Sequence, residues 1–451
     1  MIKRSSELLG QLDAGVPPEL LRSCLQEHMR GLGRLEKLCN YYAGEHAILT
    51  RQVDTKGAPN NRIVCNHAKY ITDMATGYLL GDAIKYTSKT QELDELMDRY
   101  KKADIPYIDA ELCKDASIFG RAVELVYMSD DEKPTTKSAF LDPRTAFMVY
   151  GDDVEARKLF GVYYYETYNT SGTLDGYWVH AYTERKRFSY RFRSLNDMPL
   201  SAVDALDHNM GGIPMIEYRN NEEETGDAEP IMSLIDAYNL LQSDRVNDVE
   251  RFVQAILFIK GFDLDDDEAK RLREQRMIVA KNADSGADAC WLVNALNQGD
   301  VETVRKNLEA DIHKFSMVPA LTDENFAGQA SGVAMRYKLL GFDQMIKIKE
   351  RYMEKGLRQR LKLYLSAANW QNSIDPEAID IQFTHSLPVN ELEIAQMVST
   401  LDGMVPMETL LSQLPFVVDP AEAAEAMRQE KEEAAKRQRT TFDVPLADQE
   451  E

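Results

Sequence analysis

The chain has 451 residues, of which 44% are hydrophobic and 28% are charged, and its formal net charge is −22. This length allows roughly two to four domain-sized units, and the composition is that of an ordinary globular protein. A protein that grips DNA by its phosphates needs a basic surface, so the chain as a whole is excluded from that class. It remains compatible with a protein past which DNA moves without sticking.

Membrane, secretory and disulfide signals are weak. The longest apolar runs fall far short of the roughly 20 residues that span a bilayer, and the N-terminus lacks the apolar core of a secretory signal. The five cysteines show no paired spacing, so we expect no disulfide and no structural zinc. A reducing cytosol fits this pattern, and we expect neither a membrane partner nor a cofactor.

The first part of the chain, residues 1–229, predicts helices followed by an antiparallel sheet. Residues 18–45 predict two helices broken near Gly31 and Gly33. A further helix is expected within residues 60–82, and two more within residues 90–119, divided near Pro106, with Gly120 as the expected cap at the C-terminal end. Short β-rich runs then follow at residues 122–128, 146–150, 159–168, 177–182 and 215–218.

Two short motifs in this part each allow a functional interpretation. Cys65 and His67 could be metal ligands, but no second pair accompanies them, so we favour a helical wall. The segment RKRFSYRFR at residues 185–193 alternates basic or polar residues with aromatic ones. It could form a nucleic-acid platform, whereas a half-buried strand with a solvated basic face explains it more simply.

A pair of helices is expected in the middle of the chain. Apolar residues recur at helical spacing from residue 230 to about residue 259, with polar residues such as Asp244 and Asn247 on the other face. A helix of that length measures roughly 45 Å. A second amphipathic helix is expected over residues 300–317. Its apolar stripe includes Val304, Leu308 and Ile312.

An acidic insert separates the two helices. It holds the cluster at residues 263–268 and two β-runs, at residues 277–280 and 290–293. The acids match several positions of a calcium loop, but Glu268 occupies the position that requires glycine. Acidic residues at a helix N-terminus explain the cluster better. A two-metal nuclease site would need further histidines or carboxylates, which do not accompany it in sequence.

The last part of the chain begins with the loop LTDENFAGQASG at residues 321–332, whose composition predicts a mobile surface element. A long helix follows to about residue 367, apolar on one side. Its other side is basic: Lys347, Lys349, Arg351, Lys355, Arg358, Arg360 and Lys362. A strand at residues 379–383 and three helices, 391–402, 407–414 and 420–439, are expected next. The tail from residue 440 is expected to be disordered.

Five blocks together resemble the portal proteins of tailed bacteriophages, in the siphophage branch. They are NNRIVCNHAKYITDMATGYLLGD (60–82), IPYIDAELCKDASIFGRAVELVY (105–127), GGIPMIEYRNN (211–221), LIDAYNLLQSDRVNDVERFVQAILFIKG (234–261) and DIHKFSMVPALTDENFAGQASGVAMRYKLLG (311–341). The resemblance extends to about residue 390, and the last 60 residues or so are generic, so the crown is assigned by position only.

The resemblance implies an α+β, mainly helical chain that assembles into a ring of about twelve copies. The implied parts, in chain order, are a wing (1–229), a stem helix (230–260), a clip (261–299), a second stem helix (300–318), a tunnel loop (319–332), a long wing helix with a return strand (333–389), crown helices (390–439) and a disordered tail (440–451). No catalytic and no metal residue is implied.

The resemblance also implies site residues, which lie in three of these parts. The tunnel loop would face DNA with Thr322, Asp323, Glu324, Asn325, Phe326 and Gln329. The clip would dock partners through Asp263, Asp265, Asp266, Asp267 and Arg271. The stem would contact neighbouring subunits through Leu257, Val304, Leu308 and Ile312.

The expected role is a channel at one capsid vertex, through which double-stranded DNA is packaged and ejected. The expected partners are further copies of the chain, the terminase large subunit, the head–tail adaptor, and capsid and scaffolding proteins. The ring would assemble in the host cytoplasm and end in the virion. The alternatives are a metal-dependent phage nuclease and a structural adaptor without a channel.

Overall fold

The structure is a computed structural model, and it divides into two compact units, Met1–Ala320 with Gly341–Ser386 and Leu321–Leu340 with Leu387–Glu451. It describes residues 1–53, 58–130, 134–253, 256–262, 283–292, 298–321, 332–368, 374–385, 391–411, 414, 417 and 423–430. Helices and several sheets share the described part, which agrees with the expected α+β class.

The helices of the larger unit are α1 (Pro18–Ala43), α2 (His67–Leu80), α3 (Asp94–Lys102), α4 (Ile105–Phe119), α5 (Met232–Val253) and α7 (Gln298–Ser316), together with most of α9 (Gly332–Ala367). Short 3-10 helices lie at η1 (Ser6–Gly10), η2 (Leu12–Ala14), η3 (Ala47–Thr50), η4 (Glu229–Ile231) and η5 (Pro376–Ala378). The prediction for residues 90–119 is confirmed. Pro106 lies in the first turn of α4, and Gly120 ends that helix with a left-handed φ of 82°.

The strands of this unit are β1 (Ile2–Arg4), β2 (Lys85–Thr87), β3 (Arg121–Met128), β4 (Thr136–Leu141), β5 (Ala146–Gly151), β6 (Lys158–Tyr168), β7 (Leu174–Tyr182), β8 (Lys186–Phe192), β9 (Ser201–Asp207), β10 (Met215–Arg219), β11 (Ile256–Phe262), β12 (Ala283–Leu292) and β13 (Asp380–Gln382). Besides β11, which was predicted as helix, the strands β1, β2, β4 and β9 were not predicted from the sequence. They are short or polar, so their pattern is weak.

One large sheet has the order β1-β5-β6-β7-β8-β9, and a smaller one has the order β10-β3-β4. The large sheet is not wholly antiparallel as predicted, because β1 pairs with β5 in parallel. One face of the large sheet packs against α1. Phe188, Tyr190 and Phe192 are buried in this core, which confirms the half-buried strand and removes these rings from any surface platform.

Helix α1 is continuous, whereas the sequence predicted a break near Gly31 and Gly33. Both glycines have open space around them, so neither marks a close approach of another segment. The apolar stripe through Leu21, Leu25 and Leu35 is buried on both sides of the glycines. Packing of this stripe offsets the roughly 1 kcal/mol by which each glycine disfavours a helix.

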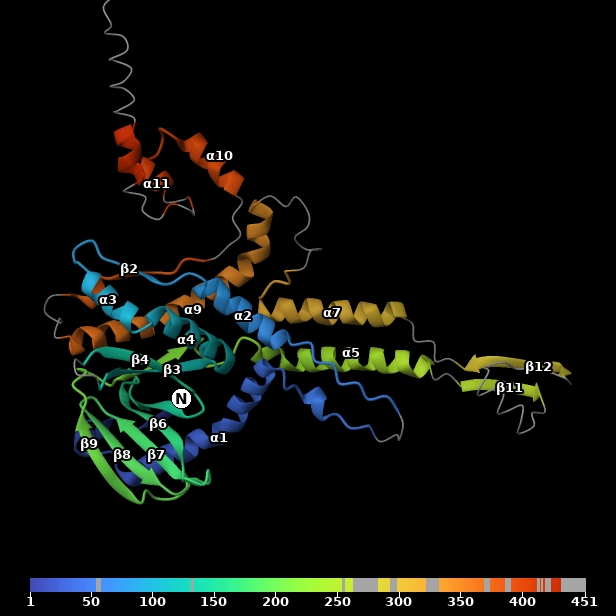
Figure 1. The fold of residues 1–451 in the computed structure, drawn as a ribbon, viewed down its shortest axis with the longest axis horizontal. Coiled ribbons are helices and arrows are strands. Elements are labelled where there is room, and N and C mark those ends of the chain that lie inside the picture. The colour runs from blue at the N-terminus through green and yellow to red at the C-terminus, as the bar shows by residue number, and fades with distance from the viewer. Residues whose placement is uncertain are drawn as a thin grey trace, which may run out of the picture. The chain divides into compact units, whose positions relative to one another are not determined.

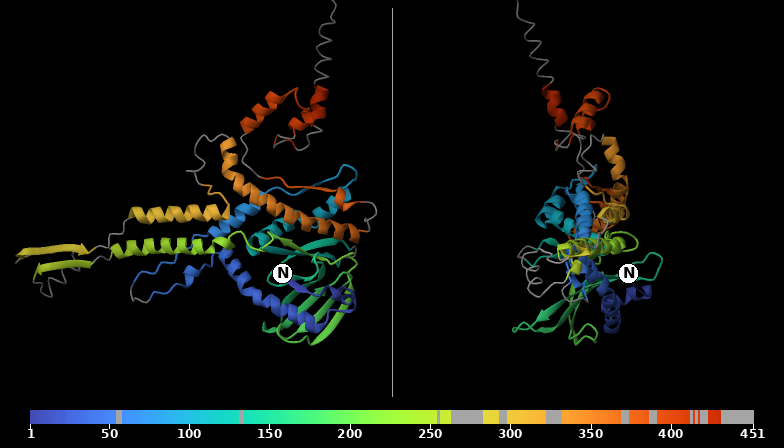
Figure 2. Two further views of the ribbon diagram at one scale, coloured as in Figure 1. Left: turned by 180° about the vertical axis from the view of Figure 1, so that it is seen from behind. Right: turned by 90° about the vertical axis from the view of Figure 1, so that its right-hand side faces the viewer.

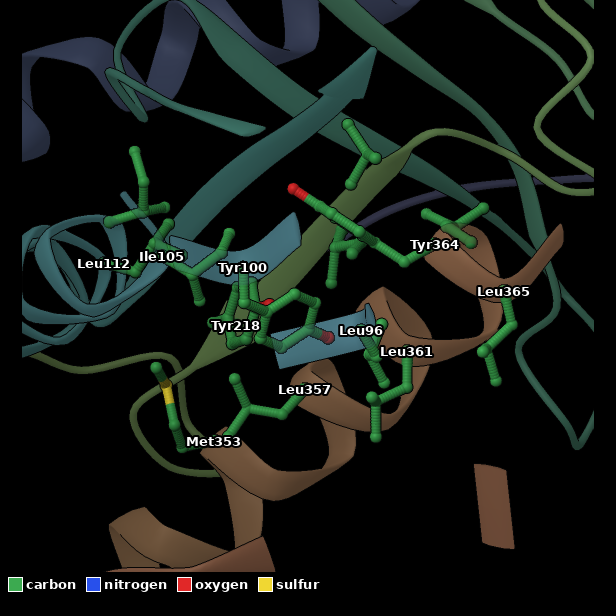
Figure 3. Packing of buried hydrophobic residues seen from close by; sticks show 14 of the residues in the cluster. Leu96, Tyr100, Ile105, Leu112, Tyr218, Met353, Leu357, Leu361, Tyr364 and Leu365 are labelled. Atoms are coloured by element: carbon green, nitrogen blue, oxygen red, sulfur yellow. The ribbon is translucent and has the colours of Figure 1, made fainter. Parts of the chain in front are cut away.

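A second core lies between the small sheet and the helices α3, α4 and α9. Figure 3 shows Leu357 and Leu361 of α9 packed toward Tyr100 of α3 and Tyr218 of β10. The predicted basic side of α9 is therefore only partly correct. Arg360 is fully buried and Lys349 nearly so, while the other lysines and arginines predicted there remain at least partly exposed.

The helix predicted to reach residue 259 ends earlier. Helix α5 stops at Val253, and Ile256–Phe262 is the strand β11, paired antiparallel with β12. A short, continuous apolar run fits a buried helix or a strand equally well, and only pairing with a distant segment decides between them. The predicted return helix is confirmed as α7. The β-run predicted at 277–280 lies outside the described residues, and that at 290–293 overlaps β12.

The smaller unit contains α10 (Glu391–Leu401), α11 (Met407–Leu411) and a helical segment at residues 423–430. These agree with the helices predicted at 391–402 and 407–414, and with part of the one predicted at 420–439. Leu410 and Leu411 are buried. The tail from residue 440 lies outside the described residues. In the larger unit, β13 pairs with β2, which confirms the predicted return strand.

Candidate functional site

Helices α5 and α7 form an antiparallel pair, and Figures 1 and 2 both show them side by side. Polar contacts cross between them at two levels. Arg245 of α5 pairs with Glu302 of α7 at 3.4 Å, and Arg305 of α7 donates a hydrogen bond to the Tyr238 hydroxyl at 3.3 Å. Arg305 also pairs with Glu302 and Glu309 on its own helix. An ion pair and a hydrogen bond, together with packing, therefore fix how the two helices align along their length.

Apolar side chains on this pair face water in the single chain. Val249 of α5 is 62% exposed, and Val304 of α7 is 48% exposed. Leu240, Val246 and Phe315 are exposed as well. Exposed apolar side chains gathered on one structure are typical of surfaces that another protein covers.

The other residues predicted to contact neighbouring subunits differ from Val304 in burial or in the element that holds them. Leu308 is half-buried, so part of its surface stays open, and its assignment stays a prediction. Ile312 is 0% exposed, so its side chain packs inside its own chain and cannot touch another; this corrects its assignment. Leu257 lies on β11, where its backbone pairs with Trp291, and not on the predicted helix.

Three polar side chains on α5 form hydrogen bonds to the backbone of the segment that precedes α2. The oxygens of Asn239, Ser243 and Asn247 accept hydrogen bonds from the backbone N–H groups of Cys65, Ile63 and Asn61, at 2.8, 2.9 and 2.7 Å respectively. Helix positions four apart recur about every 6.0 Å, and alternate residues of an extended chain about every 6.6 Å. The two spacings match, so each buried side chain meets the next available amide.

This polar ladder, residues 239, 243 and 247 with residues 65, 63 and 61, was not predicted. All three side chains are buried, including Asn247, which the sequence pattern had placed on the solvated face. The ladder satisfies backbone donors that no sheet partner reaches. The available signal was the i, i+4, i+8 spacing of three uncharged polar residues in an amphipathic helix.

Aromatic rings and histidines join α2 to the base of the helix pair. The ring of His67 lies edge-on to Tyr238 with centroids 4.9 Å apart, and 5.8 Å from the ring of His313. Burial lowers the pKa of His67 to about 4, and the neighbouring His313 contributes to the lowering. Tyr70 donates a hydrogen bond to the carbonyl of Pro319 at 2.9 Å, just beyond α7.

The interpretation of Cys65 and His67 as metal ligands gains no support. The amide of Cys65 belongs to the polar ladder, and the His67 ring packs among aromatic neighbours. Within the described ranges, no three histidine, cysteine, aspartate or glutamate side chains gather closely enough to hold a metal ion. The acidic cluster at residues 263–268 lies outside those ranges.

Helix α9 is tied to the rest of the larger unit by buried charges. Arg360 pairs with Asp109 of α4 and Glu124 of β3, and Lys349 pairs with Asp227, which lies just before η4. Lys349 also donates a hydrogen bond to the Ser117 hydroxyl at 2.6 Å. The sequence signal was a lone acid, Glu124, inside a β-rich apolar run.

Two groups of predicted site residues lie outside the described residues. The first is the clip group, Asp263, Asp265, Asp266, Asp267 and Arg271. The second is the tunnel-loop group, Thr322, Asp323, Glu324, Asn325, Phe326 and Gln329. Their flanks are described: α5 and β11 precede the first group, and α7 and α9 flank the second. Both groups stay predictions.

A comparison with protein families decides the class. The family described as "Phage portal protein, SPP1 Gp6-like" matches residues 21–437, which is most of the chain. The chain belongs to this phage portal protein family. The portal protein of Bacillus phage SPP1 is 24% identical over 412 residues, which cover 86% of this chain and 80% of that one. The portal protein of Clostridium phage phiCD119 is 22% identical over 420 residues, covering 87% and 91%.

Membership of the portal family establishes the role of the chain. A portal protein provides the channel at a capsid vertex through which double-stranded phage DNA is packaged and later ejected. Portal proteins are structural components of the virion rather than enzymes. In the part of the chain that the structure describes, no helix is long and apolar enough to cross a membrane.

Proposed function

We propose that this portal protein forms a ring of about twelve copies in which the α5–α7 pair is the channel wall. One observation carries the proposal. The pair exposes Val249 and Val304 although each helix is already packed against the other. A neighbouring copy of the same pair would cover these side chains. Covering apolar surface stabilises by about 25 cal/mol per Å², repeated at every interface of the ring.

The remaining parts follow the order of the family. Residues 1–229 and 333–389 would be the wing, residues 261–299 the clip, residues 319–332 the tunnel loop and residues 390–439 the crown. The stem would comprise 230–260 and 300–318, with β11 and β12 leading from the stem into the clip. The antiparallel course of α5 and α7 supports this plan, since it sends the chain out to the clip and back.

Charge supports passage of DNA without tight binding. The net charge of −22 is carried by every copy, so a ring multiplies it. A channel of that sign repels phosphates and leaves the duplex free to slide. In the tunnel loop, Asp323 and Glu324 would keep the duplex at a distance, while Asn325 and Phe326 would touch it without a strong bond.

Partners would engage the two ends of the ring and its outer surface. The clip acids Asp265, Asp266 and Asp267 would dock the terminase large subunit during packaging and the head–tail adaptor afterwards. The wing would contact capsid and scaffolding proteins. Assembly would take place in the host cytoplasm, before the ring enters the virion.

The decisive experiment compares assembly of three valine variants by native mass spectrometry and negative-stain imaging. Val249→Asp and Val304→Asp should yield monomers or incomplete rings, because burying an unpaired charge costs several kcal/mol. Val154→Asp is the matched control, since Val154 is fully exposed on the loop between β5 and β6. Normal rings from Val249→Asp and Val304→Asp would remove the helix pair from the interface. A wild-type monomer that cleaves DNA with Mg²⁺ would favour the nuclease alternative.

Two further variants test the loop and the clip. Replacing Asp323 and Glu324 by Lys should leave rings intact but stall packaging, because each new cation adds counterion-release affinity for DNA. The salt slope of DNA binding should steepen by roughly one unit per contact. Normal packaging by this variant at low salt would contradict the assigned role of the loop.

Replacing Asp265, Asp266 and Asp267 by Ala should weaken ATPase stimulation or adaptor binding, whereas tight calcium binding by the wild-type cluster would contradict docking.

A further inference from the structure

A cavity of about 730 Å³ lies in the larger unit, away from the α5–α7 pair. Its walls come from β5, β6, β10 and α9, with η1 and η2 contributing apolar side chains. Cavities of roughly 300–1,000 Å³ that combine apolar walls with a few converging polar groups are typical small-molecule sites. The channel role makes no use of this cavity.

Lys158 of β6 brings a half-buried cation into the cavity wall without forming an ion pair to any described residue. Its ammonium group donates to the backbone carbonyl of Met215 at 3.5 Å and to the side-chain amide oxygen of Gln359. Among the ion pairs of the described residues, none includes Lys158, and none includes Lys355, which lines the same cavity from α9. A half-buried cation gains from an anionic partner, because partial loss of water disfavours its charged form.

The acids of the cavity wall are engaged elsewhere. Glu217 of β10 accepts a hydrogen bond from the Tyr150 hydroxyl at 2.8 Å and pairs with Arg219 at 3.1 Å. Glu155 pairs with Arg157 at 3.0 Å. The remaining acid, Glu184, is exposed. Lys158 therefore shares its nearest acid, Glu217, with Tyr150 and Arg219 and forms no ion pair of its own within the described part of the chain, and the exposed Lys355 adds a second positive charge at the cavity.

The titration of Lys158 agrees with this geometry. Burial, opposed by Glu217 and Glu124 and assisted by Lys355 and Arg219, lowers the pKa of Lys158 to about 8. A group in this state gains from any anion that comes close, because the anion restores the charged form.

We propose that this cavity binds a small organic anion, with its carboxylate or phosphate group held between Lys158 and Lys355. Its apolar part would lie against Leu9, Leu12, Leu159 and Leu363, which line the same cavity. Gln359 would accept a hydrogen bond from Lys158 or donate one to the anion through its amide nitrogen. Because the site joins β6 to α9, a bound anion would tie the large sheet to that helix.

Binding is measured on the purified full-length chain by isothermal titration calorimetry at pH 7. Three probes are used at constant ionic strength: inorganic phosphate, octanoate and phenyl phosphate, with chloride as the reference salt. Phenyl phosphate or octanoate should bind more tightly than inorganic phosphate, because only they use the apolar wall. A phosphate preference would assign a phosphate ester, and an octanoate preference a carboxylate. The melting temperature should rise with the concentration of the preferred probe.

Two variants and a control test the residues. Lys158→Met and Lys355→Gln should each weaken binding by about tenfold or more, the range for a hydrogen bond to a charged group. Lys347→Met is the control, since Lys347 is also on α9 but pairs with Asp343 at an exposed position. It should bind as the wild type does. Without ligand, Lys158→Met should melt no lower than the wild type, because it removes a half-buried charge that forms no ion pair with a described residue.

Each contrary result would overturn the proposal. No binding of any probe beyond chloride would remove the site. Undiminished binding by Lys158→Met or Lys355→Gln would place the anion elsewhere. A lower melting temperature of unliganded Lys158→Met, with unchanged affinity, would mean that Lys158 serves the fold alone.

Discussion

Arg360 of α9 and Glu124 of β3 are both fully buried, and the guanidinium Nε of Arg360 lies 2.8 Å from the nearer carboxylate oxygen. The two residues are 236 positions apart in the chain. Glu124 also accepts a hydrogen bond from the Tyr218 hydroxyl at 2.6 Å, and Arg360 makes a second ion pair with Asp109. This cluster connects α9 to α4 and to the strands β3 and β10 of the small sheet.

Removing the cation from this cluster should be strongly destabilising. Arg360→Met leaves two buried carboxylates without a countercharge, and we expect a loss of about 3–5 kcal/mol in the free energy of unfolding. Urea denaturation followed by circular dichroism measures it. Lys347→Met removes an exposed pair on the same helix and should change the free energy by less than about 1 kcal/mol. Equal losses for the two variants would show that burial of the cluster is incomplete.

The polar ladder makes a prediction about single amides. Ser243→Ala removes the acceptor of the Ile63 N–H and leaves a donor unpaired, which costs about 1–3 kcal/mol. Hydrogen exchange should show faster exchange at Ile63, with smaller changes at Cys65 and Asn61. Ser233→Ala, at an exposed position on the same helix, is the control and should leave all three amides unchanged. Unaltered exchange at Ile63 in Ser243→Ala would contradict the ladder.

Two helix glycines should respond to alanine with opposite signs. At Gly31 of α1 there is open space, so Gly31→Ala should stabilise by about 0.5–1 kcal/mol through helix propensity. At Gly356 of α9 the new Cβ would lie 2.3 Å from the buried ring of Tyr218. Gly356→Ala should therefore destabilise by about 1–3 kcal/mol. Thermal unfolding of the two variants checks both signs, and a gain at Gly356 would show that Tyr218 has room to move.

His67 should make stability depend on pH in acid. Its folded pKa of about 4 is below its ordinary value of 6.5, so between these values the unfolded chain binds the proton and the folded chain does not. Stability is therefore complete above pH 6.5 and falls as the pH is lowered toward 4. His67→Phe keeps a ring against Tyr238 but cannot bind this proton. In this window its free energy of unfolding should therefore fall by up to about 1.4 kcal/mol less per pH unit than that of the wild type.

Urea denaturation of wild type and His67→Phe at several values between pH 7.5 and pH 4.5 measures this difference. His28 and His180, whose pKa values burial also lowers to about 4, remain in both proteins and contribute equally. The two profiles should run parallel above pH 7 and diverge below it. Profiles that stay parallel throughout would mean that His67 is already solvated in the folded chain.

The sequence by itself determined the elements whose pattern is long and periodic. Helices α7 and α9 were predicted to within two residues at each end, because their apolar stripes recur at helical spacing over many turns. Pro106 and Gly120 marked the bounds of α4 through their backbone preferences alone. The portal family could also be inferred, since its motifs are local and keep their order along the chain.

Only the tertiary structure decided which ambiguous segments became strands and which charges became buried. The run at Ile256–Phe262 is a strand because β12 pairs with it, and α1 is continuous because its stripe is packed along its full length. Arg360 lies inside because two acids from distant elements meet it there. Such outcomes depend on partners far away in the chain, and periodicity reports only a residue's nearest neighbours. The same reason placed Ile312 inside its own chain, left Val304 exposed, and brought Lys158 and Lys355 to one cavity.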